Sequence, residues 1–160
     1  MSGYSTFDLS QTPPLVTVPR DYNVAVDFMD RRVEEGFGDK IAFIDDNGGH
    51  TYGALQNSAN RFGNAMLDLG LQAEQRVMLL QLDSIDFPIA FFGAIKAGLV
   101  VVPVNTLLTT DDYLYMLQDS RARALVVSAE LLPVVAPILE QLPDLRHIIV
   151  TGSGDTQGHA

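Results

Sequence analysis

The stretch that decides the fold is RVMLLQLDSIDFPIAFFGAIKAGLVVVPVN, residues 76–105. It opens with one apolar run, Val77–Leu80, and closes with another, Leu99–Val102. Between the two runs, the pattern predicts a helix from about Ser84 to Ala97. A strand, a helix and a second strand joined by short connections predict a right-handed crossover between parallel strands.

The same alternation continues along the chain. Helices are expected at about Asp111–Gln118 and Glu130–Gln141, and strands at Ala124–Val127 and His147–Val150. The strands are apolar throughout rather than alternating, which is typical of strands with helices on both faces. The residues expected to begin these helices as N-caps are Asp83 or Ser84 for one helix and Thr110 for the next. Gly98 is expected to end the first of them.

The N-terminal residues follow a different pattern. Residues 1–22 contain three prolines and no period, and we expect an extended arm. A helix is expected from Asn23, its N-cap, to the glycines at 36 and 38. Its predicted apolar stripe is Val24, Phe28, Met29 and Val33.

A hairpin and a longer helix come next. Ile41–Ile44 predicts a strand, and residues 45–49 (DDNGG) predict a tight turn. Residues 50–52 are expected to form the returning strand of a hairpin. Thr51 is expected to cap the helix, and Gly70 to end it. The predicted apolar positions of this helix are Leu55, Ala59, Phe62, Met66 and Leu69.

The fold class is therefore α/β, a largely parallel sheet flanked by helices, with an N-terminal helix and β-hairpin. We divide the chain into an arm (1–22), an α/β unit (23–150) and a Gly-rich, polar tail (151–160). We expect the open sheet to be incomplete, and the tail to be a flexible linker.

The composition excludes several classes of protein. It is 47% hydrophobic and 19% charged, as in globular proteins. The formal net charge of −10 disfavours nucleic acid and anionic membranes as partners. The absence of cysteine excludes disulfides, Cys-ligated metals and thiol nucleophiles. The longest uncharged apolar run, Phe87–Ile95, is too short to span a bilayer, and residues 1–7 lack the pattern of a signal peptide, so we expect a cytoplasmic protein.

No catalytic or metal-binding constellation is visible. The histidines (50, 147 and 159) lack the spacing of metal ligands, and we expect surface or strand-edge roles for them. Asp45-Asp46 is interpreted as part of a turn rather than a metal-binding pair. The glycines of the tail do not match a dinucleotide-binding fingerprint, and no serine has a nucleophile-elbow context. The aromatic stripe at positions 87, 91 and 92 is interpreted as core.

The best general prediction for a site is the edge where parallel strands end. The loops expected there are Gln81–Ser84, Pro103–Thr110 and Ser128–Ala129, of which the second is the longest and most polar. From the residues alone, a self-contained α/β small-molecule-binding or interaction domain without catalysis remains an alternative.

Several segments, taken in order, resemble one family. HTYGAL (50–55) resembles the first core motif of the adenylate-forming enzymes, and AIKAGLVVVPVN (94–105) resembles the second. The order and spacing over Asn23–Val150 are similar to those of the adenylate-forming acyl-CoA synthetases. Residues 19–23, 105–109 and 112–117 look most like the benzoate-CoA ligases.

The resemblance implies the N-terminal part of an ATP-dependent aryl-CoA ligase. In this family a carboxylate attacks the α-phosphate of ATP, and the thiol of coenzyme A then displaces AMP. ATP, Mg²⁺ and coenzyme A are the implied cofactors of the whole ligase, and its partners are the remainder of the chain and an aromatic carboxylate; a homodimer is left open. The family's phosphate loop, aromatic-Thr-Glu motif, ribose-binding Asp and C-terminal lysine are not among these residues, so we expect the fragment to be inactive alone.

The residues that the resemblance brings nearest to a ligand are Asn105 and Thr106. In related CoA ligases the equivalent loop lies near the nucleotide end of coenzyme A. Some members carry an arginine where this sequence has Leu107, so we expect neutral hydrogen bonds at most from Asn105 or Thr106. Lys40 and Lys96 do not match the catalytic lysine of the family.

Overall fold

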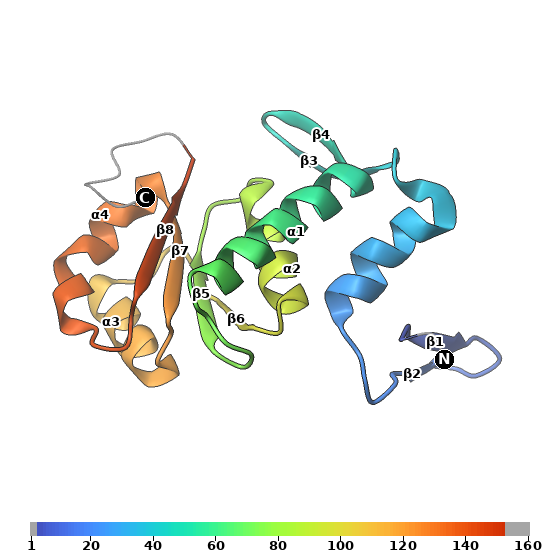
Figure 1. Cartoon of the computed structure of the whole chain (residues 1–160), viewed down its shortest axis with the longest axis horizontal. Coiled ribbons are helices and arrows are strands. Elements are labelled where there is room, and N and C mark those ends of the chain that lie inside the picture. The colour runs from blue at the N-terminus through green and yellow to red at the C-terminus, as the bar shows by residue number, and fades with distance from the viewer. Residues whose placement is uncertain (1–2, 153–160) are drawn as a thin grey trace.

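The computed structural model describes residues 3–152 and contains a four-stranded parallel sheet with helices on both faces (Figure 1). The three strand pairings are all parallel, which confirms the predicted topology. In spatial order the strands are β6 (Val100–Pro103), β5 (Arg76–Leu80), β7 (Ala124–Ser128) and β8 (His147–Thr151).

Helices cover the two faces of the sheet separately. One face packs against α1 (Tyr52–Asp68) and α2 (Asp86–Lys96). The other face packs against α3 (Thr110–Ser120) and a broken helix. Successive residues of β5 alternate between the two cores: Val77 faces α1 and α2, whereas Met78 faces α3. Because both faces are covered, the strands are apolar throughout.

The helices α1 and α2 approach each other through glycine. A Cβ atom on Gly93 would lie 2.6 Å from the carbonyl oxygen of Ala59, and one on Gly63 would lie 2.8 Å from the carbonyl oxygen of Gly93. Both distances are too short for a side chain, so the two backbones are in direct contact at this crossing.

The N-terminal region lies beside α1 and α2 (Figure 1). The stretch expected to be an extended arm contains two short antiparallel strands. The helix after Asn23 winds largely as π-helix, and Asn23 caps it as predicted, because its Oδ1 accepts the backbone N–H of Ala25 at 3.0 Å. The predicted hairpin follows. The bounds of these elements are β1 Thr6–Asp8, β2 Leu15–Thr17, η1 Val26–Asp30, η2 Val33–Phe37, β3 Ile41–Asp45 and β4 Gly48–Thr51.

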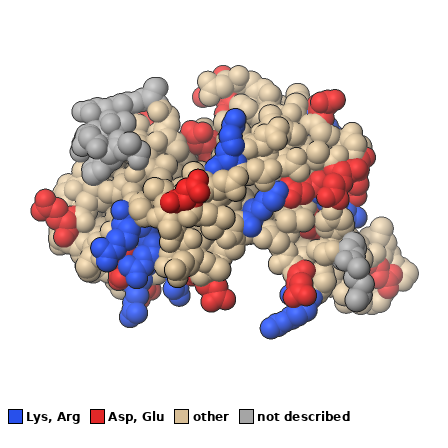
Figure 2. Space-filling model, viewed as in Figure 1, with Lys and Arg blue, Asp and Glu red and all other residues tan. Residues whose placement is uncertain are grey.

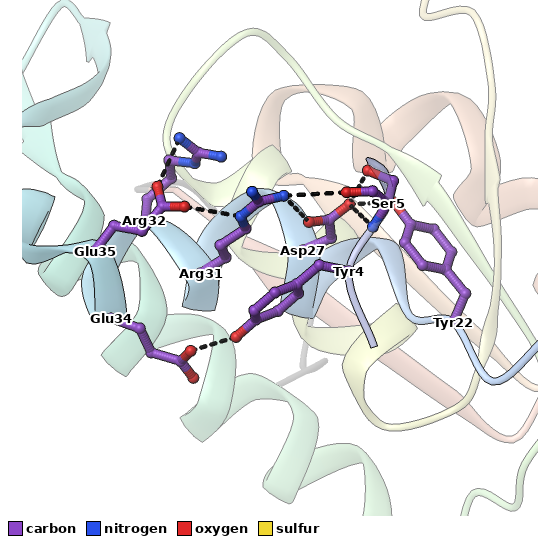
Figure 3. A network of polar contacts seen from close by, with 8 residues as sticks. All are labelled: Tyr4, Ser5, Tyr22, Asp27, Arg31, Arg32, Glu34 and Glu35. Atoms are coloured by element: carbon purple, nitrogen blue, oxygen red, sulfur yellow. Dashed lines mark hydrogen bonds and ion pairs between the residues drawn. The ribbon is translucent and has the colours of Figure 1, made fainter. Parts of the chain in front are cut away.

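A polar network holds the first residues against this helix (Figure 3). The buried carboxylate of Asp27 accepts hydrogen bonds from the backbone and hydroxyl of Ser5, from the hydroxyl of Tyr22 and from Arg31. The hydroxyl of Tyr4 donates to Glu34. Burial alone would raise the pKa of Asp27, but these hydrogen bonds outweigh it and hold the pKa at about 2.

Two predicted core positions are wrong. Phe28 is 56% exposed, because π-helical turns carry more residues than the α-helical period and so rotate the buried face toward other positions. Leu69 is exposed because α1 ends at Asp68, and Leu69 belongs to the turn that Gly70 closes with a φ of 85°.

Three helix boundaries also differ from prediction. Thr109, not Thr110, caps α3, while the hydroxyl of Thr110 donates to the carbonyl of Val134. Neither Asp83 nor Ser84 occupies the N-cap position of α2, which begins at Asp86 after Ile85, but the Oγ of Ser84 accepts the backbone N–H of Asp86 at 3.3 Å. The helix expected at 130–141 is broken into short pieces, because prolines at 133 and 137 lack the N–H that continues a helix. These pieces are η3 Ala129–Leu131, α4 Leu132–Val135 and η4 Ala136–Gln141.

Candidate functional site

The predicted loops meet at one edge of the sheet, which we call the carboxyl edge because all four strands end there. Hydrogen bonds join the ends of three strands. The Nε2 of Gln81, after β5, donates to the Oγ1 of Thr151 at 3.2 Å. The backbone N–H of Leu82 donates to the Oγ of Ser128 at 2.9 Å. The centre of the carboxyl edge is therefore polar and ordered.

One acceptor at this edge lacks a partner. Gln81 is only 5% exposed, and its Oε1 receives no hydrogen bond from any residue within 3–152. An unpaired buried acceptor costs about 1–3 kcal/mol relative to one that is hydrogen-bonded. Sequence reasoning placed Gln81 in a loop but did not single it out.

The hairpin β3–β4 is fixed to the start of α2 by Asp45. Its Oδ2 accepts the backbone N–H of Ile85 at 3.0 Å, and its Oδ1 lies 2.9 Å from the Nε2 of His50. The hydrogen bond with His50, followed by that of Ile85, lowers the pKa of Asp45 to about 2. Asp45, which lies on the hairpin, therefore accepts a backbone N–H at the N-terminus of α2, beside a hollow of about 180 Å³ that Ser84 also lines. The turn interpretation of Asp45-Asp46 is confirmed.

The Asn105 loop, residues 104–109, leaves β6 and leads into α3. Asn105 folds the loop locally, because its Oδ1 accepts the backbone N–H of Leu107 at 2.9 Å. Tyr113 holds the same loop from below: its hydroxyl donates to the carbonyl of Asn105 at 2.8 Å and accepts the N–H of Leu108 at 3.2 Å.

The far end of the Asn105 loop is fixed by a capping box. The Oγ1 of Thr109 accepts the N–H of Asp112 at 3.3 Å, and the carboxylate of Asp112 accepts the N–H of Thr109 at 3.0 Å. The hydroxyl of Thr109 also lowers the pKa of Asp112, because it donates to the charged form. Between the two fixed ends, the side-chain Nδ2 of Asn105 and the hydroxyl of Thr106 make no hydrogen bond with any other described residue. Both groups are available to a ligand.

Charge is divided between the two edges of the sheet. The three loops of the carboxyl edge contain no Lys or Arg, and the first turns of α2 and α3 carry Asp86, Asp111 and Asp112. At the opposite edge, Arg123 and Arg146 line a polar hollow of about 360 Å³. In Figure 2, Lys and Arg side chains gather at the lower left, where β7 and β8 begin. The carboxyl edge therefore offers a ligand neutral hydrogen bonds but no positive charge.

The remaining residues considered in the sequence as ligands or as core lie elsewhere in the fold. His147 lines the hollow just described, and His159 and the glycines at 154 and 158 lie outside the described residues. Among residues 3–152, no three His, Cys, Asp or Glu side chains are grouped to hold a metal ion. No helix in this part of the chain has the length and apolarity needed to cross a membrane. The residues of the aromatic stripe are partly buried and pack against the core: Phe87 and Phe91, whose ring centroids are 5.9 Å apart, lie against the cluster below α1 and α2, and Phe92 lies against a second cluster.

An open parallel sheet with a polar carboxyl edge is the architecture of many nucleotide- and coenzyme-binding domains. The family profile described as AMP-binding enzyme matches residues 30–159, and the chain belongs to this family. It is 50% identical over 149 residues to the benzoate–CoA ligase of Thauera aromatica, covering 92% of this chain and 28% of the relative. It is also 50% identical over 133 residues to the 4-hydroxybenzoate–CoA/benzoate–CoA ligase of Rhodopseudomonas palustris, covering 83% of this chain and 25% of that protein.

Solved structures give the same result. A benzoate CoA ligase from Burkholderia xenovorans LB400 matches with a TM-score of 0.76 at 42% identity, covering 82% of this chain and 26% of that one. The anthranilate CoA ligase AuaEII, in complex with anthranoyl-AMP, matches with a TM-score of 0.80 at 39% identity, covering 86% of this chain and 26% of that one.

A more distant relative by sequence is a long-chain-fatty-acid–CoA ligase of Escherichia coli O157:H7, which is 29% identical over 138 residues, 86% of this chain and 24% of that protein. The chain thus spans about a quarter of the length of the relatives it matches.

Proposed function

We propose that this chain forms the N-terminal part of an aryl-CoA ligase. The ligase joins benzoate to coenzyme A in two steps. A carboxylate oxygen attacks the α-phosphate of ATP and pyrophosphate leaves; the thiol sulfur of coenzyme A then attacks the acyl carbon and AMP leaves. Mg²⁺ on the triphosphate would offset the phosphate charge.

The observation that carries this proposal is the gradient of similarity among the relatives. Identity is 50% to two ligases named for benzoate, 32% to two named for hydroxybenzoates alone, and 33% and 29% to two named for fatty acids. The support therefore lies in the step from the benzoate ligases to all the others, and each match covers between 72% and 92% of this chain. Benzoate is therefore the substrate we propose, within a cytoplasmic pathway of aromatic degradation; a homodimer remains open.

In this proposal the chain contributes a scaffold and one ligand-facing loop. The Asn105 loop faces coenzyme A, with the amide of Asn105 and the hydroxyl of Thr106 as neutral hydrogen-bonding groups. The absence of cations from the carboxyl edge supports a division of labour, because phosphates require positive charge that these loops lack. The cations and the phosphate loop come from the remainder of the ligase, so residues 1–160 are inactive alone.

A chimera tests the proposal. In it, residues 1–150 of this chain replace the matching N-terminal segment of the Thauera aromatica ligase. We expect it to form benzoyl-CoA with a kcat within about tenfold of the unaltered ligase, since the fold and the loop are shared. The assay separates benzoyl-CoA, AMP and pyrophosphate after incubation with benzoate, ATP, Mg²⁺ and coenzyme A.

The matched control carries the corresponding segment of the Escherichia coli fatty-acid ligase. We expect this control to support much less benzoyl-CoA formation. A folded chimera that binds ATP but forms no benzoyl-CoA would contradict the proposal. Equal activity of the two chimeras would show that the N-terminal segment does not distinguish aryl ligases from fatty-acid ligases, and only membership of the wider family would remain supported.

A further inference from the structure

Three arginines form a row at the amino edge of the sheet, the edge where the parallel strands begin. Arg76, Arg123 and Arg146 each stand one residue before a position that is paired across β5, β7 and β8. The carbonyl of Arg76 accepts the backbone N–H of Arg123 at 2.8 Å, and the carbonyl of Arg123 accepts that of Arg146 at 2.9 Å. Neighbouring strands lie about 4.8 Å apart, so the three side chains leave the sheet at regular, closely spaced positions.

The positive charge of this row is neutralised only in part by the described residues. Within residues 3–152, Arg123 alone of the three has an ion pair, with 3.1 Å between its Nη1 and the Oδ1 of Asp144. Arg76 and Arg146 are exposed and form no ion pair with this part of the chain, and neither does the nearby Glu74. Like charges this close repel each other, so the row favours an anion that lies between them.

The surface beside the row is concave. Arg123 and Arg146 line the hollow of about 360 Å³ at this edge, and Gln75 and His147 contribute further polar groups to its wall. A hollow of this volume falls in the range of small-molecule sites. Guanidinium groups suit phosphate in particular, because their planar N–H groups form two parallel hydrogen bonds with its oxygens.

We propose that the amino edge is a binding site for a small anion that carries two linked phosphate groups, held by Arg123 and Arg146 with Arg76 as a third contact. One phosphate reaches two neighbouring guanidinium groups, whereas a diphosphate extends along the row. The net charge of −10 disfavours a nucleic acid as the occupant, and the small hollow favours a small molecule over an extended polypeptide.

This site is separate from the carboxyl edge. The five residues of β5 place the two edges of the sheet about 16 Å apart, so one phosphate group cannot contact both. The proposal therefore does not rest on the function proposed above, and each can fail without the other.

Calorimetric titration of the whole chain, residues 1–160, with inorganic pyrophosphate tests the proposal. Low ionic strength is needed, because salt screens exposed charges. We expect one pyrophosphate to bind with a dissociation constant of about 0.1 mM, and inorganic phosphate to bind about tenfold more weakly, since it forms fewer charge-assisted hydrogen bonds. The three loops of the carboxyl edge contain no Lys or Arg that would compete for the probe.

Arg123→Gln and Arg146→Gln should each weaken pyrophosphate binding at least about tenfold, because each removes charged hydrogen-bond donors. Arg146 is exposed and has no ion pair among the described residues, so its replacement guards against misfolding. The matched control is Arg20→Gln, which removes the same charge from an exposed side chain of the N-terminal region and should bind as the unaltered chain does. Circular dichroism checks that all three variants are folded.

Each outcome supports or overturns the site. Weaker binding in both edge variants, with binding unchanged in Arg20→Gln, supports it. Equal weakening in all three variants would show a general effect of net charge, and no saturable binding of pyrophosphate would show that the row is only solvated; either result overturns the proposal. A hexaglutamate peptide that binds as tightly as pyrophosphate would also overturn it, because the edge would then recognise an acidic polypeptide.

Discussion

The N-terminal region, residues 3–51, exposes most of its large hydrophobic side chains, whereas the α/β unit, residues 52–152, buries most of its own. Ten of the sixteen exposed large hydrophobic residues lie in the first region, which is a third of the described chain. Only Ala25 and Met29 of that region belong to the buried hydrophobic core. The α/β unit has a core of its own, whereas the N-terminal region depends on contacts with its neighbours.

Specific polar contacts attach the N-terminal region to the α/β unit. The Nδ2 of Asn23 donates to the carbonyl of Ile95 at 2.9 Å, and the Nζ of Lys96 lies 2.5 Å from the Oδ2 of Asp30. Asp45 bonds the start of α2 as described above. Lys96, which stands in a family motif, therefore ties the first helix to α2. The exposed apolar side chains of this region could pack against another protein surface.

The largest expected effect distinguishes the buried α/β unit from the exposed N-terminal region. Leu125→Ala, at a fully buried position of β7, should lower the free energy of unfolding by about 3 kcal/mol, because it leaves a cavity between packed layers. Leu15→Ala removes the same atoms from the exposed strand β2 and should change it by less than about 0.5 kcal/mol. Urea unfolding followed by circular dichroism measures both. Equal losses would contradict the contrast between the regions.

The next effect concerns the α1–α2 crossing. Gly93→Ala should cost about 2 kcal/mol, because its Cβ would overlap the backbone of Ala59. Gly38→Ala is the matched control in the N-terminal region, since a Cβ there would make an ordinary contact of 3.7 Å. The same urea titration tests the pair. A neutral Gly93→Ala would show that the helices separate without loss.

A third effect should appear in the N-terminal region alone. Asp27→Asn removes the charge that Ser5, Tyr22 and Arg31 surround, and should release the first residues at a cost of about 1.5 kcal/mol. Limited proteolysis should then cut the arm faster while the α/β unit resists. Unchanged cleavage of the arm would show that the network does not hold it.

The same carboxyl predicts a dependence on pH. The folded-state pKa of Asp27, about 2, lies below its usual value of 3.8, so the stability it contributes is complete above pH 4 and lost as the pH falls toward 2. Cleavage of the arm by an acid-active protease should rise over this range in the unaltered chain. In Asp27→Asn this component of the pH dependence should be absent, and its persistence would assign the titration to another group.

The smallest effect is expected at the boundary of the two regions. Thr51→Ala should cost about 1 kcal/mol, because the N–H of Ala54 loses its acceptor at the start of α1. Thr51→Ser keeps the hydroxyl and should stay within a few tenths of a kcal/mol. Thermal unfolding of the two variants provides the comparison, and equal melting temperatures would argue against the cap.

What the sequence could predict was set by local patterns in both regions. The parallel strands, the hairpin and the caps at Asn23 and Thr51 follow from local patterns, and all are confirmed. The prediction that Phe28 is buried was wrong, because its exposure depends on π-helical winding, which the apolar period does not encode. Thr109 was missed because Thr109 and Thr110 are both good caps, and the choice depends on Asp112 and on the distant carbonyl of Val134.

The site was less predictable than the fold. The loop of Asn105 and Thr106 could be placed at the carboxyl edge because strand ends locate it. The partners of Tyr113 and the unpaired Oε1 of Gln81 could not, because both arise from tertiary contacts. A tyrosine at a position where the helix pattern requires an apolar side chain is the only signal in the sequence that could have marked the first of them.

Benzoate-dependent ATP–pyrophosphate exchange, measured side by side for the chimera and for residues 1–160 alone, tests most directly whether this chain is the scaffold part of a ligase. We predict exchange in the chimera and none above background in the isolated chain. Exchange catalysed by the isolated 160 residues, or its absence from a folded chimera that binds ATP, would contradict it.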